Sequence, residues 1–218
     1  MKKISWLLFL VLFLNVQCRF NSSKKKGEET TPEKEVKTTE QLMAEEKARQ
    51  DSAKNAEIEI VQKTAFGNLM FGMEKDSVEE FNEKRQLVGK YNYNFSYSFN
   101  GENQLYKVKL SSDVVKVIQF DTDLKNNYLN LLKILEAQYG KPLISKNYPS
   151  VFDVQENKKY EINRWEIGVK QINLALQENG LNSYSATCEI LDKNMEEIEN
   201  QRLKNLKNKD IIEASKRF

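Results

Sequence analysis

The chain has 218 residues, of which 39% are hydrophobic and 30% charged, and 34 basic against 32 acidic residues give a formal charge of +2. It contains no histidine, which excludes a Ser-His-Asp triad, a Cys-His pair and every histidine-ligated metal site. A charge so close to neutral argues against nucleic acid as a partner.

The start of the chain is typical of an export signal. Met1-Lys2-Lys3 is basic, and the apolar run from Ile4 to Leu14 is interrupted only by Ser5. This run is too short to cross a bilayer, which takes about 20 helical residues. We therefore expect residues 1–17 to be a signal peptide.

Cys18 stands where a bacterial lipoprotein signal would place its cysteine. The stretch resembles a relaxed lipobox, in which Asn15 and Gln17 occupy the positions usually held by leucine and by a small residue. The resemblance implies cleavage before Cys18, acylation by fatty acids such as palmitate, and anchoring to an inner or outer bacterial membrane. The alternatives are a plain secreted protein, or an uncleaved apolar anchor that ends at Cys18.

Residues 18–56 are polar and charged, which predicts a flexible tether. A coil of this length has a root-mean-square reach of roughly 30–35 Å. Thr38 and Gln41 form a capping-box pattern ahead of Leu42 and Met43, so a short helix is expected within the tether. Its thin apolar stripe would make that helix marginal without a docking surface.

The folded domain is expected to span residues 57–218. Asp76 with Glu79 predicts a helix that has Val78, Phe81 and Arg85 on one face. The preceding Phe71-Gly72-Met73 is similar to a phrase in small bacterial envelope proteins of unassigned role. The alternative is that Gly72 only supplies a tight turn.

The most informative stretch runs from Tyr91 to Phe99, where aromatic residues alternate with asparagine and serine. Alternation of period two predicts a strand with five rings on one face and short polar side chains on the other. The rings must be covered by a helix, a second sheet or a ligand.

Asn100-Gly101 predicts a hairpin onto a strand over Leu105–Leu110, and Val114–Phe120 is predicted to be a third strand. Asp121 and Asp123 precede the clearest helical pattern, which Gly140 and Pro142 end. Its apolar positions are Leu124, Tyr128, Leu131, Leu132, Leu135 and Tyr139. We expect this stripe to cover the five rings.

Three further strands are predicted over 160–168, 169–177 and 182–191, followed by a charged helix over 194–218. A helix with three strands, repeated, predicts an α+β fold with antiparallel strands, a disordered N-terminal tether and a C-terminal helix. The order, with Tyr139-Gly140-Lys141-Pro142 ending the middle helix, is similar in layout to two-lobed outer-membrane assembly lipoproteins and β-lactamase-inhibitor folds. This resemblance implies no functional residues.

No catalytic, cofactor or metal site is predicted. Asp121 and Asp123 are read as helix caps in preference to metal ligands, and Cys188 as a core residue in preference to a nucleophile. We therefore expect a non-catalytic interaction or scaffold lipoprotein of the cell envelope, which binds a membrane through Cys18 and an unidentified envelope protein. The alternative is a ligand-binding lipoprotein with an aromatic-lined pocket for a small apolar molecule or a glycan.

Overall fold

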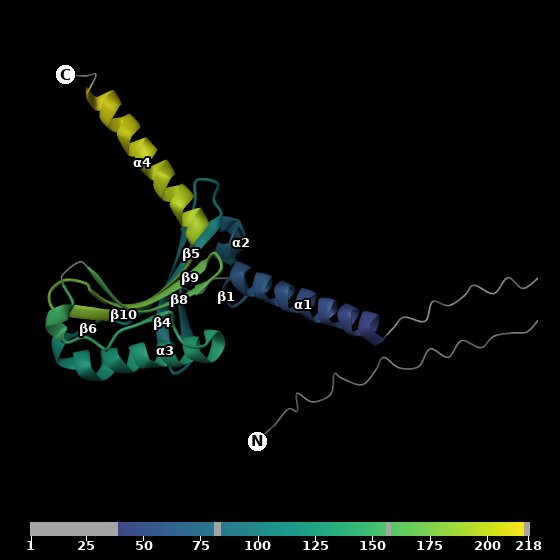
Figure 1. Cartoon of the computed structure of the whole chain (residues 1–218). Helices are drawn as coiled ribbons and strands as arrows, with labels where there is room; N and C mark the ends of the chain where they lie inside the picture. The colour runs from purple at the N-terminus through teal and green to yellow at the C-terminus, as the bar shows by residue number, and fades with distance from the viewer. Residues whose placement is uncertain (1–38, 81–83, 156–157, 216–218) are drawn as a thin grey trace, which may run out of the picture. The chain divides into compact units, whose positions relative to one another are not determined.

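The computed structural model describes residues 39–80, 84–155 and 158–215 (Figure 1). The leader, Cys18 and the first part of the tether lie outside these residues. Contacts divide the chain into Met1–Ala44 and Glu45–Phe218, and the fold described below is that of the second unit. The helices are α1 Thr39–Lys63, α2 Lys75–Glu80, α3 Lys125–Tyr139 and α4 Lys193–Ser215. The strands are β1 Thr64–Phe66, β2 Leu69–Met70, β3 Arg85–Val88, β4 Tyr91–Phe99, β5 Leu105–Ser112, β6 Val115–Lys116, β7 Ile144–Ser145, β8 Lys159–Ile167, β9 Lys170–Glu178 and β10 Ser183–Asp192.

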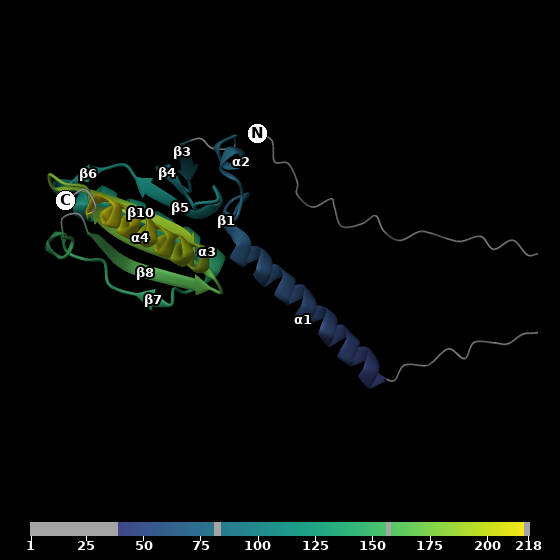
Figure 2. The ribbon, with the colours of Figure 1, turned by 90° about the horizontal axis from the view of Figure 1, so that it is seen from above.

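The fold is α+β, as the sequence predicts, and its main sheet is antiparallel. The strand order is β3-β4-β5-β10-β9-β8-β7, with β6 paired to β10. Figure 2 shows β4, β5, β10, β8 and β7 in this succession from above. Two meanders, β3-β4-β5 and β8-β9-β10, meet where β5 pairs with β10. The three strands predicted in the second half of the chain are confirmed.

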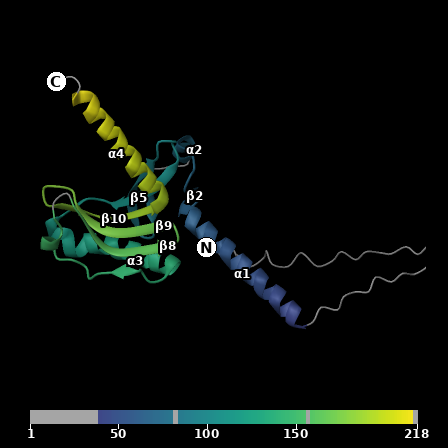
Figure 3. The same cartoon turned by 45° about the horizontal axis from the view of Figure 1, so that its top comes forward.

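Helix α3 covers one face of this sheet (Figure 3). It buries Tyr128, Leu131 and Leu135, at the helical spacing that the sequence shows. Gly140 ends the helix with φ +75°, a conformation that glycine adopts at little cost, and the Gly140 carbonyl accepts a 2.8 Å hydrogen bond from the Trp165 indole.

The aromatic strand is confirmed as β4, with its rings turned inward and Asn92, Asn94 and Ser96 exposed. The sequence predicts that α3 alone covers the five rings, and the structure differs. Helix α3 meets Tyr93, whose hydroxyl donates a 2.9 Å hydrogen bond to the Asn127 carbonyl. Phe66 of β1 packs edge-on against Phe95, with 5.1 Å between the ring centroids. The rings therefore have two covers, a helix and a hairpin.

Two predicted elements of the first half are wrong in extent. The expected strand over 114–120 is only the two-residue β6, because the chain then forms a 3-10 turn and a π-helical turn that bury Phe120 against Tyr184. The helix predicted after Asp76 is described over Lys75–Glu80, its expected member Phe81 lies outside the described residues, and Arg85 belongs to β3 and not to the helix. A helix followed by three strands does occur in the first half of the domain, but the three strands are β3, β4 and β5, and the expected strand over 114–120 is not one of them.

The tether prediction included a short helix, and the structure has a longer one. Helix α1 starts at Thr39 and continues to Lys63, through the expected boundary at residue 56, with no buried residue. Its C-terminal end is held to the domain, since the Phe71 amide donates a 2.9 Å hydrogen bond to the Lys63 carbonyl. Within the described ranges, no helix is both long enough and apolar enough to cross a membrane.

Candidate interaction surfaces

The outward side chains of β4 continue as polar rows across the neighbouring strands. One row consists of Arg164, Asn173, Glu189, Lys109 and Ser96, and the next of Glu161, Ala175, Thr187, Ser111 and Asn94. Because successive side chains of a strand point to opposite faces, these rows lie opposite Leu174, Cys188 and Leu110 of the core. We call this surface the polar face.

Long side chains connect the strands of the polar face. Lys109 donates a 3.0 Å hydrogen bond to Gln177, and Lys159 forms an ion pair with Glu189. Burial and the nearby Lys159 charge lower the pKa of Lys109. The face is therefore a network of both charge signs, which fits a partner with a mixed polar surface better than a polyanion.

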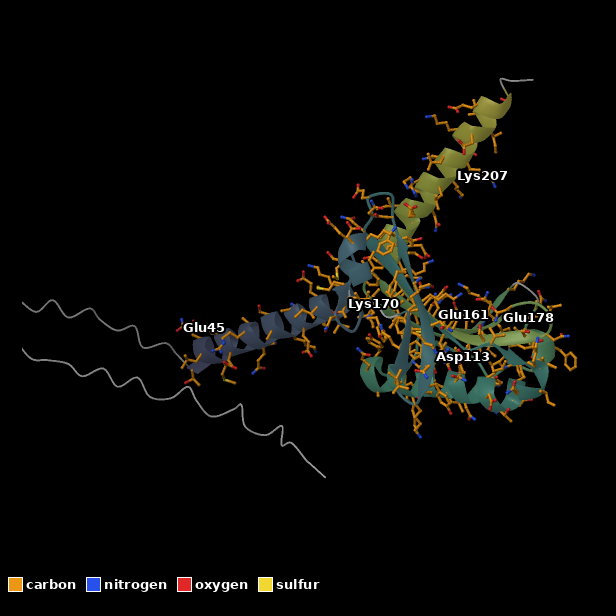
Figure 4. The ribbon with its side chains drawn as sticks, turned by 180° about the vertical axis from the view of Figure 1, so that it is seen from behind. Glu45, Asp113, Glu161, Lys170, Glu178 and Lys207 are labelled. Atoms are coloured by element: carbon orange, nitrogen blue, oxygen red, sulfur yellow. The ribbon has the colours of Figure 1, made fainter. Side chains whose placement is uncertain are left out.

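Helix α4 begins at one end of the polar face. Its first turns are held there by ion pairs of Lys193 with Glu166 and of Glu196 with Lys107. From Asn200 to Glu213 every residue is exposed, and Figure 4 shows side chains projecting from α4 on all sides around Lys207. The apolar side chains of this exposed part are Leu203, Leu206, Ile211 and Ile212.

The two aspartates before α3 do not cap it. Asp121 and Asp123 lie in the π-helical turn, and α3 has no side-chain cap at its start. The Asp123 carboxylate instead accepts a 2.7 Å hydrogen bond from the Gln119 side chain. The described residues contain no group of three or more carboxylate or cysteine side chains placed to hold a metal ion.

Cys188 lies in the core, as the sequence predicts, and only 1% of it is exposed. Burial raises the pKa of its thiol to about 12, so the thiol is neutral and unreactive at ordinary pH. A thiol in this state is not a nucleophile.

Lys170, which the sequence does not single out, is completely buried near Cys188. Its ammonium group donates hydrogen bonds to the Tyr139 hydroxyl, 2.9 Å away, and to the Val61 carbonyl of α1, 3.4 Å away. Figure 4 shows this side chain where the C-terminal end of α1 meets the sheet. Burial lowers the pKa of Lys170 to about 8. A lysine at the start of a strand gives no sequence signal for such an environment.

Between the sheet and α3, the side chains of Tyr93, Tyr128, Leu131 and Leu135 are buried in one core cluster. A hollow of about 600 Å³ lies elsewhere, beside β1, β2 and the far end of β4. The residues that line it are Phe66, Gly67, Asn68, Leu69, Met73, Gln86 and Tyr97. Of the five rings of β4, Tyr97 is the one that borders this space.

Comparison with known proteins gives no relative. The chain matches no protein-family model, no curated protein and no solved structure.

Proposed function

We propose that this chain is a lipid-anchored, non-catalytic interaction module of a bacterial cell envelope. The lipid anchor is supported by the sequence alone, through the leader over residues 1–17 and Cys18 behind it. The absence of catalysis is supported by the buried, neutral state of Cys188.

One observation carries the proposal of an interaction surface. The polar face consists of ordered rows of side chains from five adjacent strands. Its exposed members Asn94 and Ser96 are short, while Ala175 and Thr187 are buried. Short amide and hydroxyl groups on a rigid sheet offer hydrogen bonds at a low cost in side-chain entropy. Such a face suits a folded protein partner, with α4 beside it as a second contact.

The experiment is capture of the acylated full-length protein from its own envelope, followed by mass spectrometry. A Ser96→Arg variant places a long cation at the β4 end of the polar face, next to Lys109, and should reduce recovery of a bound protein about tenfold, because it introduces steric overlap and an unpaired charge into the contact. Gln138→Arg, on the exposed surface of α3, is the matched control and should retain the partner. Equal recovery with both variants would contradict a contact through the polar face.

The anchor is tested separately. A Cys18→Ala variant cannot be acylated at this position, so it should leave the membrane fraction and appear in the soluble fraction. If the variant stays in the membrane fraction to the same extent, acylation of Cys18 is not what holds the protein there.

A second candidate function has its own support. The hollow beside Tyr97 has a volume within the range of small-molecule sites, roughly 300–1,000 Å³, and favours a ligand-binding lipoprotein. The sequence predicts a small apolar molecule or a glycan as the ligand. Binding to the folded chain should raise its unfolding temperature as the ligand concentration increases, and no rise would contradict this function.

A further inference from the structure

Three large apolar side chains project into solvent from turns of the domain. Phe152, Leu181 and Ile118 are 93%, 89% and 86% exposed, more than any other large apolar side chain in the described part of the chain. Ile118 and Phe152 lie in short 3-10 turns, and Leu181 lies in the turn between β9 and β10. We call these three side chains the apolar tip.

Two of these turns are hydrogen-bonded to each other. The Val117 amide donates a 3.2 Å hydrogen bond to the Asn182 carbonyl, so the turn of Ile118 lies against the turn of Leu181. Glu178, the last residue of β9, marks this end of the sheet in Figure 4.

A cluster of rings connects the turn of Phe152 to the other two. Phe120, which follows the turn of Ile118, has its ring centroid 5.1 Å from that of Tyr184 and 5.6 Å from that of Tyr148. Tyr184 begins just after the turn between β9 and β10, and Tyr148 leads into the turn of Phe152. The three turns therefore share one packed base at one end of the sheet. Several exposed apolar side chains in one place mark a site of contact, whereas a single one does not.

The backbone at Leu181 also calls for an explanation. Leu181 has φ +53° and follows Gly180, which has φ +85°. A left-handed conformation is costly for a residue with a Cβ atom, and glycine or asparagine would form this turn more easily. Because the side chain is exposed, packing in the core does not account for leucine at this position either.

The shape and charge of the tip favour a lipid surface. Side chains that project from separate turns can enter the fluid interface of a bilayer, whereas a folded protein would need a matching pocket for each of them. Polar groups behind the tip carry both signs: Lys116 donates a 2.8 Å hydrogen bond to Ser183, and Asp153 accepts one of 2.9 Å from Ser150. Burial of apolar surface would therefore drive the contact, with little contribution from charge.

The tether keeps a membrane within reach of the tip. Acylation of Cys18, as proposed above, puts the membrane at one end of residues 18–38 and α1 at the other, and this segment can span at most about 70 Å. Helix α1, with 25 residues, is about 37 Å long, and the nine residues of β9 span about 30 Å. The segment is thus long enough for the tip to return to the same membrane, and tethering raises its effective concentration there.

We propose that the apolar tip inserts into the surface of the lipid bilayer that holds the anchor, so that the folded domain makes a second contact with the membrane. This rests on the lipid anchor of the proposed function and goes beyond it, because it assigns a surface of the domain and the partner that covers it. The polar face consists of other residues and is left open to a protein.

The test uses the acylated full chain in phosphatidylcholine vesicles, with and without a nitroxide on the lipid acyl chains that quenches a dye in contact with the bilayer. A Leu181→Cys variant carries the dye NBD, which attaches at position 181 because Cys18 is acylated and Cys188 is buried. We expect quenching of this dye. Adding Phe152→Asp should lower the ratio of inserted to free tip roughly tenfold, since a large apolar side chain is lost and a charge is gained. Phosphatidylglycerol in the vesicles should change this ratio little.

Two controls separate insertion from mere proximity. NBD on a Gln138→Cys variant should not be quenched, because Gln138 is exposed at the other end of the sheet, beside the Tyr139 that meets Lys170. Asn147→Asp adds a negative charge at another exposed position and should leave the quenching at position 181 unchanged. Phe152→Asp should keep the unfolding temperature of the parent chain, since the replaced side chain is exposed, so a loss of quenching would not reflect unfolding.

Three results would overturn the inference, and they are distinguishable. If the chain floats with the vesicles and the dye at position 181 is quenched no more than the dye at position 138, the inference is wrong and the anchor stands. If the chain does not float with the vesicles, the inference and the anchor are both wrong. If the emission at position 181 changes with protein concentration and not with the nitroxide lipid, a second copy of the chain covers the tip and the inference is wrong.

Discussion

Lys170 offers a direct test of the energetics of the domain. Its ammonium group is completely buried, and no carboxylate in the described part of the chain pairs with it. We predict that Lys170→Met makes the protein more stable at pH 7, because methionine fills similar space without a charge to bury.

The magnitude follows from the pKa of Lys170. Burial lowers it from 10.5 to about 8, which corresponds to a penalty of about 3 kcal/mol when the amine is protonated in both states. The substitution also removes the hydrogen bond to Tyr139, worth about 1 kcal/mol. The expected gain in the free energy of unfolding at pH 7 is therefore about 2 kcal/mol.

The pKa of Lys170 also predicts how the stability difference between the parent chain and Lys170→Met changes with pH. Below the folded pKa of about 8 the penalty is fully present, and it disappears as the pH rises toward the unfolded value of 10.5, since the unfolded state then binds more protons than the folded state. Stability of the parent chain should thus rise relative to Lys170→Met between pH 8 and 10, and the two should be about equally stable near pH 10.

The assay is urea unfolding followed by circular dichroism at pH 7, 8, 9 and 10. Both chains contain the same tyrosines and the same Cys188, so their ionisation cancels in the difference. Lys133→Met, an exposed position on α3, is the control and should give a difference independent of pH. A constant difference between the parent chain and Lys170→Met over this range would refute the argument.

Three other predictions concern the exposed turn at Gly89 and two residues of the core. Gly89→Ala should destabilise the domain by roughly 2–3 kcal/mol in urea unfolding, because at φ +65° its Cβ would lie 2.5 Å from Asn130 Oδ1, an atom that accepts from the Lys90 amide. Tyr128→Phe should cost about 1–3 kcal/mol in the same assay, since the Asn163 oxygen loses its 2.7 Å partner, and no change would contradict the bond. In a Cys18→Ala chain, Cys188 is the remaining thiol. Because it is buried, it should react with Ellman's reagent about a hundredfold faster in urea than in buffer. Rapid reaction in buffer would contradict its burial.

The sequence predicts the strands well where alternation is strict. Tyr91 to Phe99 alternates without a break, and the structure has β4 over those residues. The same holds for β9, where Ile172, Leu174 and Leu176 are fully buried. Side-chain period alone decides which face of such a strand is apolar, so no knowledge of the partner strands is needed.

The sequence predicts poorly where tertiary contacts override a local pattern. Val114 to Phe120 has the composition of a strand, yet β6 ends at Lys116 because the Val117 amide bonds to the Asn182 carbonyl and Phe120 turns into a cluster with Tyr148 and Tyr184. Strand β3 has only four residues and two of them are exposed, so its pattern is too short to detect.

The place of the hollow follows from how the five rings of β4 are covered. A helix of 15 residues is about 22 Å long, and α3 meets β4 only in its first turn, where Asn127 accepts from Tyr93, while the helix also packs on β9 and β10. The rings beyond Tyr93 need another cover, which Phe66 supplies for Phe95. The β1–β2 hairpin has only five residues in its strands, so it ends beside Tyr97 without enclosing it. Two short covers on one long aromatic strand thus leave a gap at Tyr97, and a longer side chain at Gly67 would be the simplest way to close it.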